Sequence, residues 1–183
     1  MRKLIVSVHI SLDGFVAGPN GEMDWIHVDD ELFDYISKLT SQSDAAIYGR
    51  VTYQMMDAYW PTAADQPEAS NHDIEHSEWY NRVEKYVLSV TLTDQKPKTT
   101  FLSGDIAEKV GSIKAQSGEK LLMFGSPTAA QTLMRLNLVD ELWLFVNPVL
   151  LGRGIPFYKD PSQTKRLHLI ESHVFSSGVT ELH

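Results

Sequence analysis

The sequence predicts a single α/β domain with three layers, in which helices cover both faces of a mostly parallel sheet. Three observations lead to this prediction. The chain has 183 residues and no long polar tract, which suits one domain with one core. Short β-branched apolar runs alternate with helical segments for most of the chain, a pattern typical of parallel sheets. The last two apolar runs instead flank Ser177 and Gly178, and they predict an antiparallel edge.

Strands are expected where short runs of apolar and β-branched residues occur. In chain order these runs cover residues 4–10, 45–48, 85–91, 100–103, 121–124 and 141–151, and the closing hairpin covers 166–175 and 179–182. Helices are expected over residues 29–39, 51–59, 71–84, 106–115 and 128–136. The first helix has one apolar face, and its acidic start suits the positive end of a helix. Residues 62–70 are polar and contain Pro67, so a loop is expected there.

The composition excludes several classes of function. The chain carries 16 basic and 24 acidic side chains, a net charge of −8, so non-specific nucleic-acid binding is not expected. It has no cysteine, which excludes disulfides, thiolate zinc sites and cysteine nucleophiles. The first apolar run is interrupted by His9, Ser11 and Asp13 and is too short and polar for a signal peptide or membrane span. We therefore expect a cytoplasmic protein with no membrane partner.

One predicted strand is followed directly by residues that suit a phosphate. The strand at 45–48 leads into Gly49, Arg50 and Thr52. Ligands of open α/β sheets bind at such carboxyl ends of strands. Glycine permits a close backbone approach, while a cation, a hydroxyl and free helix amides can together hold phosphate. The alternative is an ordinary strand–helix turn with a surface arginine.

A second strand end carries Gly125, Ser126, Pro127 and Thr128. Serine favours the N-cap of a helix and proline its first turn, so the remaining amides could accept an anion. The alternative is simply a well-capped helix. A third strand end carries two hydroxyls, and such side chains are more typical of turns.

Residues 72–76 match the H-x-x-E-H pattern of one class of zinc peptidases. On a helix, His72 and His76 would share a face at the i, i+4 spacing that zinc requires. The surrounding segment 65–78 is very polar, which is typical of a solvated insertion, and no third ligand is identifiable. We therefore expect no metal, and a zinc hydrolase is a discounted alternative.

Four segments, in their order and spacing, resemble the dihydrofolate reductase superfamily. The likeness is greatest to the reductase domain of bifunctional riboflavin-biosynthesis proteins and its stand-alone relatives. The segments cover residues 11–18, 49–53, 125–126 and 138–154. The resemblance spans nearly the whole chain and implies one dihydrofolate reductase-like domain over residues 1–183, assembled as a homodimer.

The resemblance also implies NADPH as the cofactor and gives each strand end a role. The residues implied at the adenosine side are Gly49, Arg50, Thr52, Ser89 and Thr91. Those implied at the pyrophosphate are Gly125, Ser126 and Thr128, and those implied beside the nicotinamide are Val8, His9, Val16 and Ala17. Residues 18–25 would form a lid over the active site.

The chain departs from folate reductases on the substrate side. Phe145 stands about where they carry a threonine, and Pro127 removes one amide donor. Their helix carboxylate would match Asp30 or Asp29, so Asp30 is the candidate catalytic residue; the alternative is a favourable charge at a helix start. These departures favour a reductase of the 5-amino-6-(5-phosphoribosylamino)uracil type over dihydrofolate reductase. The alternative of another class is a non-catalytic NADP-binding protein, because no acid–base residue is clear.

Overall fold

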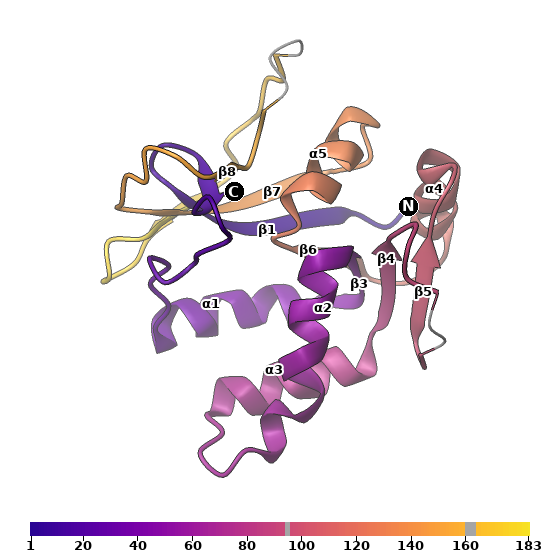
Figure 1. The fold of residues 1–183 in the computed structure, drawn as a ribbon, viewed down its shortest axis with the longest axis horizontal. Coiled ribbons are helices and arrows are strands. Elements are labelled where there is room, and N and C mark those ends of the chain that lie inside the picture. Colours follow the sequence, from indigo (N-terminus) through magenta and orange to yellow (C-terminus); the bar gives the residue numbers. More distant parts are fainter. Residues whose placement is uncertain (94–95, 160–163) are drawn as a thin grey trace.

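The computed structural model describes residues 1–93, 96–159 and 164–183. Within these residues, eight strands form one sheet in the order β5-β4-β3-β6-β1-β7-β10-β9 (Figure 1). Its parallel strands are β1 (Leu4–Ser11), β3 (Ser43–Gly49), β4 (Glu84–Leu88), β5 (Thr99–Leu102), β6 (Lys120–Phe124) and β7 (Glu141–Asn147). The antiparallel edge strands are β9 (Ser172–Val174) and β10 (Thr180–Leu182). A separate small sheet consists of β2 (Phe15–Ala17) and β8 (Ile155–Pro156).

Helices cover both faces of the large sheet, so the predicted three-layer fold is confirmed. One face carries α1 (Asp30–Ser41), α2 (Arg50–Tyr59) and α3 (Asn71–Arg82), and the other carries α4 (Ile106–Ala115) and α5 (Pro127–Arg135). The side chains of β1 alternate between these layers. Leu4, Val6 and Val8 pack with α4 and α5, whereas Ile5 packs with α1, α2 and α3. Both faces of this strand are therefore buried, as expected at the centre of a parallel sheet.

Two predicted strands end earlier than expected. β4 ends at Leu88 because Ser89 Oγ accepts the backbone N–H of Thr91 at 3.2 Å and turns the chain. β7 ends at Asn147 because Pro148 has no N–H with which to continue the ladder. In both cases the apolar run continues past the strand, so hydrophobicity alone overestimates its length.

Two polar regions also differ from expectation. Trp60–Asp65 form a 3₁₀ helix, η1, which includes the first residues of the loop expected at 62–70. The prediction of a solvated insertion at 65–78 is wrong for one face of α3, where His76 is buried. In the closing hairpin, residues 166–171 form no strand, because the N–H groups of 170 and 171 both bond to the carbonyl of His183.

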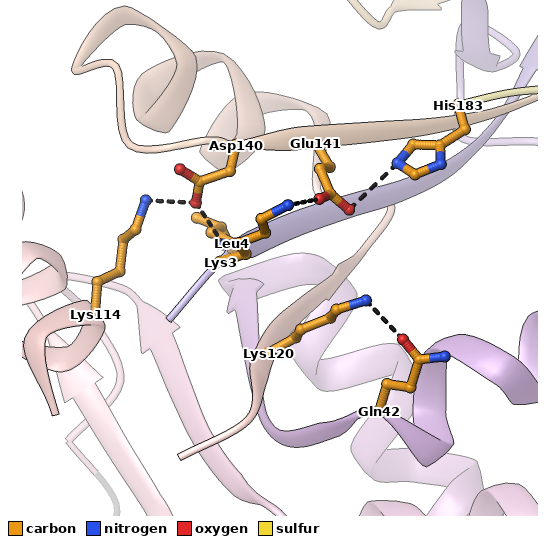
Figure 2. Close-up of polar contacts among 8 residues, drawn as sticks. All are labelled: Lys3, Leu4, Gln42, Lys114, Lys120, Asp140, Glu141 and His183. Carbon is orange, nitrogen blue, oxygen red and sulfur yellow. Dashed lines mark hydrogen bonds and ion pairs between the residues drawn. The ribbon is translucent and has the colours of Figure 1, made fainter. Parts of the chain in front are cut away.

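Charged side chains close the amino ends of the strands (Figure 2). The Lys114 ammonium, whose side chain is 2% exposed, lies 2.6 Å from Asp140 Oδ2. The same oxygen accepts the backbone N–H of Leu4 at 2.7 Å, which ties the start of β1 to the start of β7. Beside this pair, Lys3 Nζ lies 2.6 Å from Glu141 Oε1. The charged side chains at the amino ends of β1 and β7 therefore form ion pairs within the domain.

Candidate functional site

β3 and β6 are neighbours in the sheet, and the connections that follow them run toward opposite edges of the sheet. β3 leads through α2, η1 and α3 to β4 on one side, whereas β6 leads through α5 to β7 on the other. Open α/β sheets bind ligands at such switch points, outside the carboxyl ends of the strands. The motifs at Gly49 and Gly125 both lie here.

The amino ends of α2 and α5 touch at the switch point. Gly49 donates its N–H to Ser126 Oγ at 3.0 Å. A Cβ atom on Gly49 would lie 3.3 Å from Ala129 Cβ, so glycine permits this approach. Gly125 has a φ of +54°, and a Cβ atom on it would lie 3.9 Å from the Thr52 side chain. The structure thus brings both predicted phosphate motifs together.

Neither of these two helices is capped by a side chain. Ser126 occupies the N-cap position of α5 as predicted, but the expectation that its hydroxyl caps the helix is wrong. Its backbone is left-handed, with φ +54°, and Oγ instead pairs with the Gly49 N–H and the Phe124 carbonyl. The first turns of α2 and α5 also carry no acidic residue. Two positive helix ends with free N–H groups therefore meet, an arrangement that favours an anion.

A hollow of about 370 Å³ opens beside the start of α2. Its lining residues are Arg50, Leu88, Ser89, Val90, Thr91, Leu102, Ser103, Gly104 and Ile106. Arg50 is exposed and donates a hydrogen bond to Gln54 Oε1 at 3.1 Å, and no other described residue accepts a bond from its guanidinium. The hydroxyls of Ser89 and Thr91 lie 3.5 Å apart on the same hollow. One cation and two hydroxyls can together hold a phosphate monoester.

The residues implied at the nicotinamide divide between the two faces of the sheet. Val8, Val16 and Ala17 are buried in the core that α4 and α5 cover. The ring of His9 lies on the opposite face and stacks on Phe145, with ring centroids 5.1 Å apart. Burial lowers the pKa of His9 to about 4, so the imidazole is neutral near pH 7. His9 therefore offers hydrogen bonds there and no charge.

The predicted lid, residues 18–25, is organised by Glu22. The backbone N–H and the side-chain amide of Asn20 donate to the Glu22 carboxylate at 2.9 and 2.7 Å. The carbonyl of Glu22 accepts the Gly18 N–H at 2.8 Å and the Trp25 indole N–H at 3.1 Å. Sequence reasoning missed Glu22, although an acid next to an Asn-Gly turn is a usable signal. The greater mobility of this loop and its ordering on ligand binding stay predictions.

Asp30, the candidate catalytic carboxylate, is exposed at the start of α1. Its neighbour Asp29 caps the helix by accepting the Leu32 N–H at 2.9 Å. Asp30 lines a hollow of about 370 Å³ whose other walls are Phe33, Asp34, Ser70, Asn71, His72 and Glu75. The structure thus groups Asp30 with α3 and not with the strand-end residues. This position suits the alternative of a favourable charge at a helix start.

His72 and His76 lie among aromatic rings. His72 stacks on Phe33 with ring centroids 3.5 Å apart, and the His76 centroid lies 3.9 Å from that of Trp60. Burial lowers the pKa of His76 to about 3, so this ring is neutral in the native state. In the part of the chain that the structure describes, no group of three His, Asp or Glu side chains could hold a metal ion. The absence of bound zinc stays a prediction that elemental analysis would check.

Asn147 is a residue of this region that sequence reasoning missed. It ends β7, is 1% exposed, and its amide contacts β1 and the loop before α1. Its signal in the sequence is faint, one amide at the end of an apolar run and before a proline. A buried amide of this kind must find its partners within the fold.

The layers, strand order and antiparallel edge define a dihydrofolate reductase-like α/β domain. The chain belongs to the family of RibD C-terminal domains, whose model matches residues 2–180. The uncharacterized protein YyaP of Bacillus subtilis (strain 168) is 31% identical over 183 residues, which cover 99% of this chain and 93% of that protein. Among the described residues, no helix has the length and apolar character needed to cross a membrane.

Two crystal structures illustrate the shared fold. A putative riboflavin biosynthesis protein from Shewanella sp. PV-4 has a TM-score of 0.73 at 23% identity, covering 98% of this chain and 96% of that one. The diaminohydroxyphosphoribosylaminopyrimidine deaminase/5-amino-6-(5-phosphoribosylamino)uracil reductase of Thermotoga maritima has a TM-score of 0.67 at 14% identity, covering 99% of this chain and 55% of that one. The resemblance stated from the sequence is therefore confirmed for family and fold.

Proposed function

We propose that this protein is an NADPH-dependent reductase of a small pyrimidine of the 5-amino-6-(5-phosphoribosylamino)uracil class. Family membership supports a reductase, and the Thermotoga maritima relative carries that substrate in its name. One observation at the switch point supports NADPH as the cofactor. Arg50 lines a hollow at the same switch point where two uncapped helix ends meet.

The residues present fit a phosphorylated dinucleotide. A ribose phosphate is strongly anionic, and a chain of net charge −8 must offset it with a local cation. The planar fork of Arg50 can meet two phosphate oxygens, and Ser89 and Thr91 can add hydrogen bonds. The free amides of α2 and α5 would hold the pyrophosphate.

The lining of the hollow also favours NADPH over NADH. Sites that prefer NADH often place an acid on the bare ribose hydroxyl, and none of the described residues that line this hollow is acidic. When bound, the cofactor supplies the hydride. The chain itself would bind the cofactor and the substrate, orient them toward each other and exclude water.

The α1 face at the end of β1 would receive the substrate. The ring of His9 lies there, is neutral, and rests on the fully buried ring of Phe145. Phe145 removes a hydroxyl that could pair with the amide-like edge of a pterin, and such pairing gives most polar discrimination. We therefore expect weak or no turnover of dihydrofolate. A kcat/KM above about 10⁴ M⁻¹s⁻¹ with dihydrofolate would contradict this substrate class.

The cofactor is tested by titrating NADPH and NADH against wild type, Arg50→Ala and Gln54→Ala. A charge-assisted hydrogen bond is worth about 1.5–3 kcal/mol, so Arg50→Ala should weaken NADPH by about tenfold to a hundredfold. NADH should change far less because it lacks the phosphate. Gln54→Ala removes the partner of Arg50 and keeps the cation, so it should leave NADPH affinity nearly unchanged.

The reaction is tested by loss of NADPH absorbance with 5-amino-6-(5-phosphoribosylamino)uracil and with dihydrofolate. Turnover of the pyrimidine supports the proposal, and binding of NADPH without turnover supports the non-catalytic alternative. Equal weakening of NADPH and NADH by Arg50→Ala would show that Arg50 does not bind the phosphate.

We also propose that the protein is a homodimer. The segment before β9 exposes Leu167, Leu169 and Ile170 to 70, 59 and 61%. These residues adjoin a hollow of about 730 Å³ formed with β7, β10 and the end of α5. Exposed apolar groups that adjoin one another mark association surfaces. Sedimentation should show a dimer for wild type and a monomer for Leu169→Glu, and a monomeric wild type would contradict the proposal.

A further inference from the structure

Asn147 connects three segments at the carboxyl end of the sheet. It lies opposite Ser11 of β1, and its amide is almost fully buried. Asn147 Oδ1 accepts the backbone N–H of His27 at 3.2 Å. Nδ2 lies 3.1 Å from the Phe145 carbonyl and 3.4 Å from the Ile10 carbonyl. The amide therefore holds β7, β1 and the loop before α1 to one another.

These backbone partners fix which way the amide points. The N–H of His27 can only donate, so it must face the amide oxygen. The carbonyls of Phe145 and Ile10 can only accept, so they must face the amide nitrogen. Reversing the amide would set two donors together on one side and an oxygen against two carbonyls on the other. The orientation is thus determined by groups whose hydrogen-bonding roles cannot change.

The same nitrogen faces the ring of His9. Asn147 Nδ2 lies 3.4 Å from His9 Nδ1. The two N–H donors of Nδ2 are shared among these three acceptors, and Nδ2 has no lone pair that could accept an Nδ1–H. Nδ1 is therefore the unprotonated nitrogen, and the proton of the neutral ring resides on Nε2. Within the described residues, no protein group pairs with Nε2, whereas Phe145 supports the ring face. His9 therefore carries an N–H donor that no described residue uses, on a ring that rests against buried Phe145.

We propose that Asn147 is a positioning residue that fixes His9 as the Nε2–H tautomer, so that His9 donates a hydrogen bond to a carbonyl or ring nitrogen of the heterocyclic substrate. The identity of the substrate rests on the proposed function, but the tautomer does not. Through the His27 N–H, the same amide also ties the loop before α1 to β7. One buried side chain thus sets both the donor and the loop beside it.

The tautomer is tested by NMR on the ligand-free chain labelled with ¹⁵N-histidine, near pH 7. His9→Phe keeps an aromatic ring on Phe145 and identifies the His9 signals by their loss. We expect the wild-type ring to show the Nε2–H pattern. Asn147→Asp keeps an oxygen for His27 but removes the donor that faces Nδ1, so it should move the proton toward Nδ1. Asn81→Asp on the exposed face of α3 is the matched control, and it should leave the tautomer of His9 unchanged.

The donor is tested by turnover of 5-amino-6-(5-phosphoribosylamino)uracil with NADPH. A neutral hydrogen bond contributes about 0.5–1.5 kcal/mol, so His9→Phe and Asn147→Asp should lower kcat/KM by up to about tenfold. For His9→Phe, the unfolding midpoint should stay near wild type, which a merely structural role would not predict.

The outcomes separate the inference from the function on which it rests. An Nδ1–H ring in wild type overturns the inference whether or not Asn147→Asp folds. An unchanged kcat/KM in His9→Phe overturns the donor role. A wild type that shows the Nε2–H ring but does not bind NADPH supports the His9–Asn147 pair and refutes the proposed cofactor.

Discussion

Helices α1, α3 and α4 begin differently from α2 and α5. The first three follow Asp29, Ser70 and Asp105, and each of these side chains accepts an N–H of its own helix. Their first turns also contain acidic residues. α2 and α5 follow Gly49 and Ser126, with no side-chain cap and no acid in the first turn.

The difference shows where the domain leaves polar groups open to a ligand. The first N–H groups of any helix lack partners within the helix and must be satisfied elsewhere. In α1, α3 and α4 a neighbouring side chain accepts one of these N–H groups. The two uncapped helices meet at the switch point, where the Gly49 nitrogen lies 3.0 Å from Ser126 Oγ. Arg50 lines the hollow beside the start of α2. An anion bound there can accept hydrogen bonds from the free N–H groups of both α2 and α5.

The largest expected effect comes from giving α2 the acid that it lacks. Val51 is 59% exposed in the first turn, so Val51→Asp adds a carboxylate without disturbing the core. The carboxylate should satisfy the free amides and repel phosphate, so NADPH affinity should fall on the order of a hundredfold. The favourable charge at the helix start should meanwhile raise the free energy of unfolding by about 0.3–1 kcal/mol. Cofactor titration and urea unfolding measure the two effects.

Met55→Asp is the control for the Val51 variant. Met55 is 48% exposed on the same helix but lies beyond its first turn. The change in net charge is the same, whereas the helix-end amides stay free. If both variants weaken NADPH equally, long-range charge explains the loss and the uncapped end does not.

Glu181 is a buried polar group away from the switch point that also lacks a full set of hydrogen-bond partners among the described residues. It is fully buried, its Oε1 has no partner among the described residues, and Oε2 accepts a hydrogen bond from Tyr35 at 3.3 Å. Burial raises the pKa of Glu181 to about 7. An acid whose folded pKa is raised stabilises the fold below its unfolded pKa, and this stability is lost as pH rises toward 7.

Glu181→Gln should therefore change the pH dependence of stability. Relative to wild type, the variant should gain on the order of 2 kcal/mol between pH 5 and pH 8, because it carries no buried charge. Urea unfolding at both pH values measures the gain, and NADPH affinity should not change. Parallel pH profiles for the two proteins would mean that Glu181 titrates normally in the fold.

The sequence could predict those features whose signals are local. The strands, the helices and the strand-end motif at Arg50 follow from runs of neighbouring residues. The bond between Gly49 and Ser126 joins residues 77 positions apart, and that between His27 and Asn147 joins residues 120 apart. No local pattern specifies such pairings. The buried face of α3 was hidden for a different reason, since a histidine occupies a core position that usually holds an apolar residue.

The smallest expected effect comes from removing a cap that serves structure alone. Ser70 Oγ accepts the Asp73 N–H at 3.1 Å, and the Asp73 carboxylate accepts the Ser70 N–H at 3.0 Å, so the two residues cap α3 reciprocally. Ser70→Ala should lower the free energy of unfolding by about 1 kcal/mol, whereas Ser70→Thr should retain most of it. Neither change should alter the NADPH Kd, because α3 begins away from the switch point. Urea unfolding and cofactor titration of both variants provide the measurement. A loss of NADPH affinity in Ser70→Ala alone would show that capped helix ends also support the site, and the division between the two groups of helices would then fail.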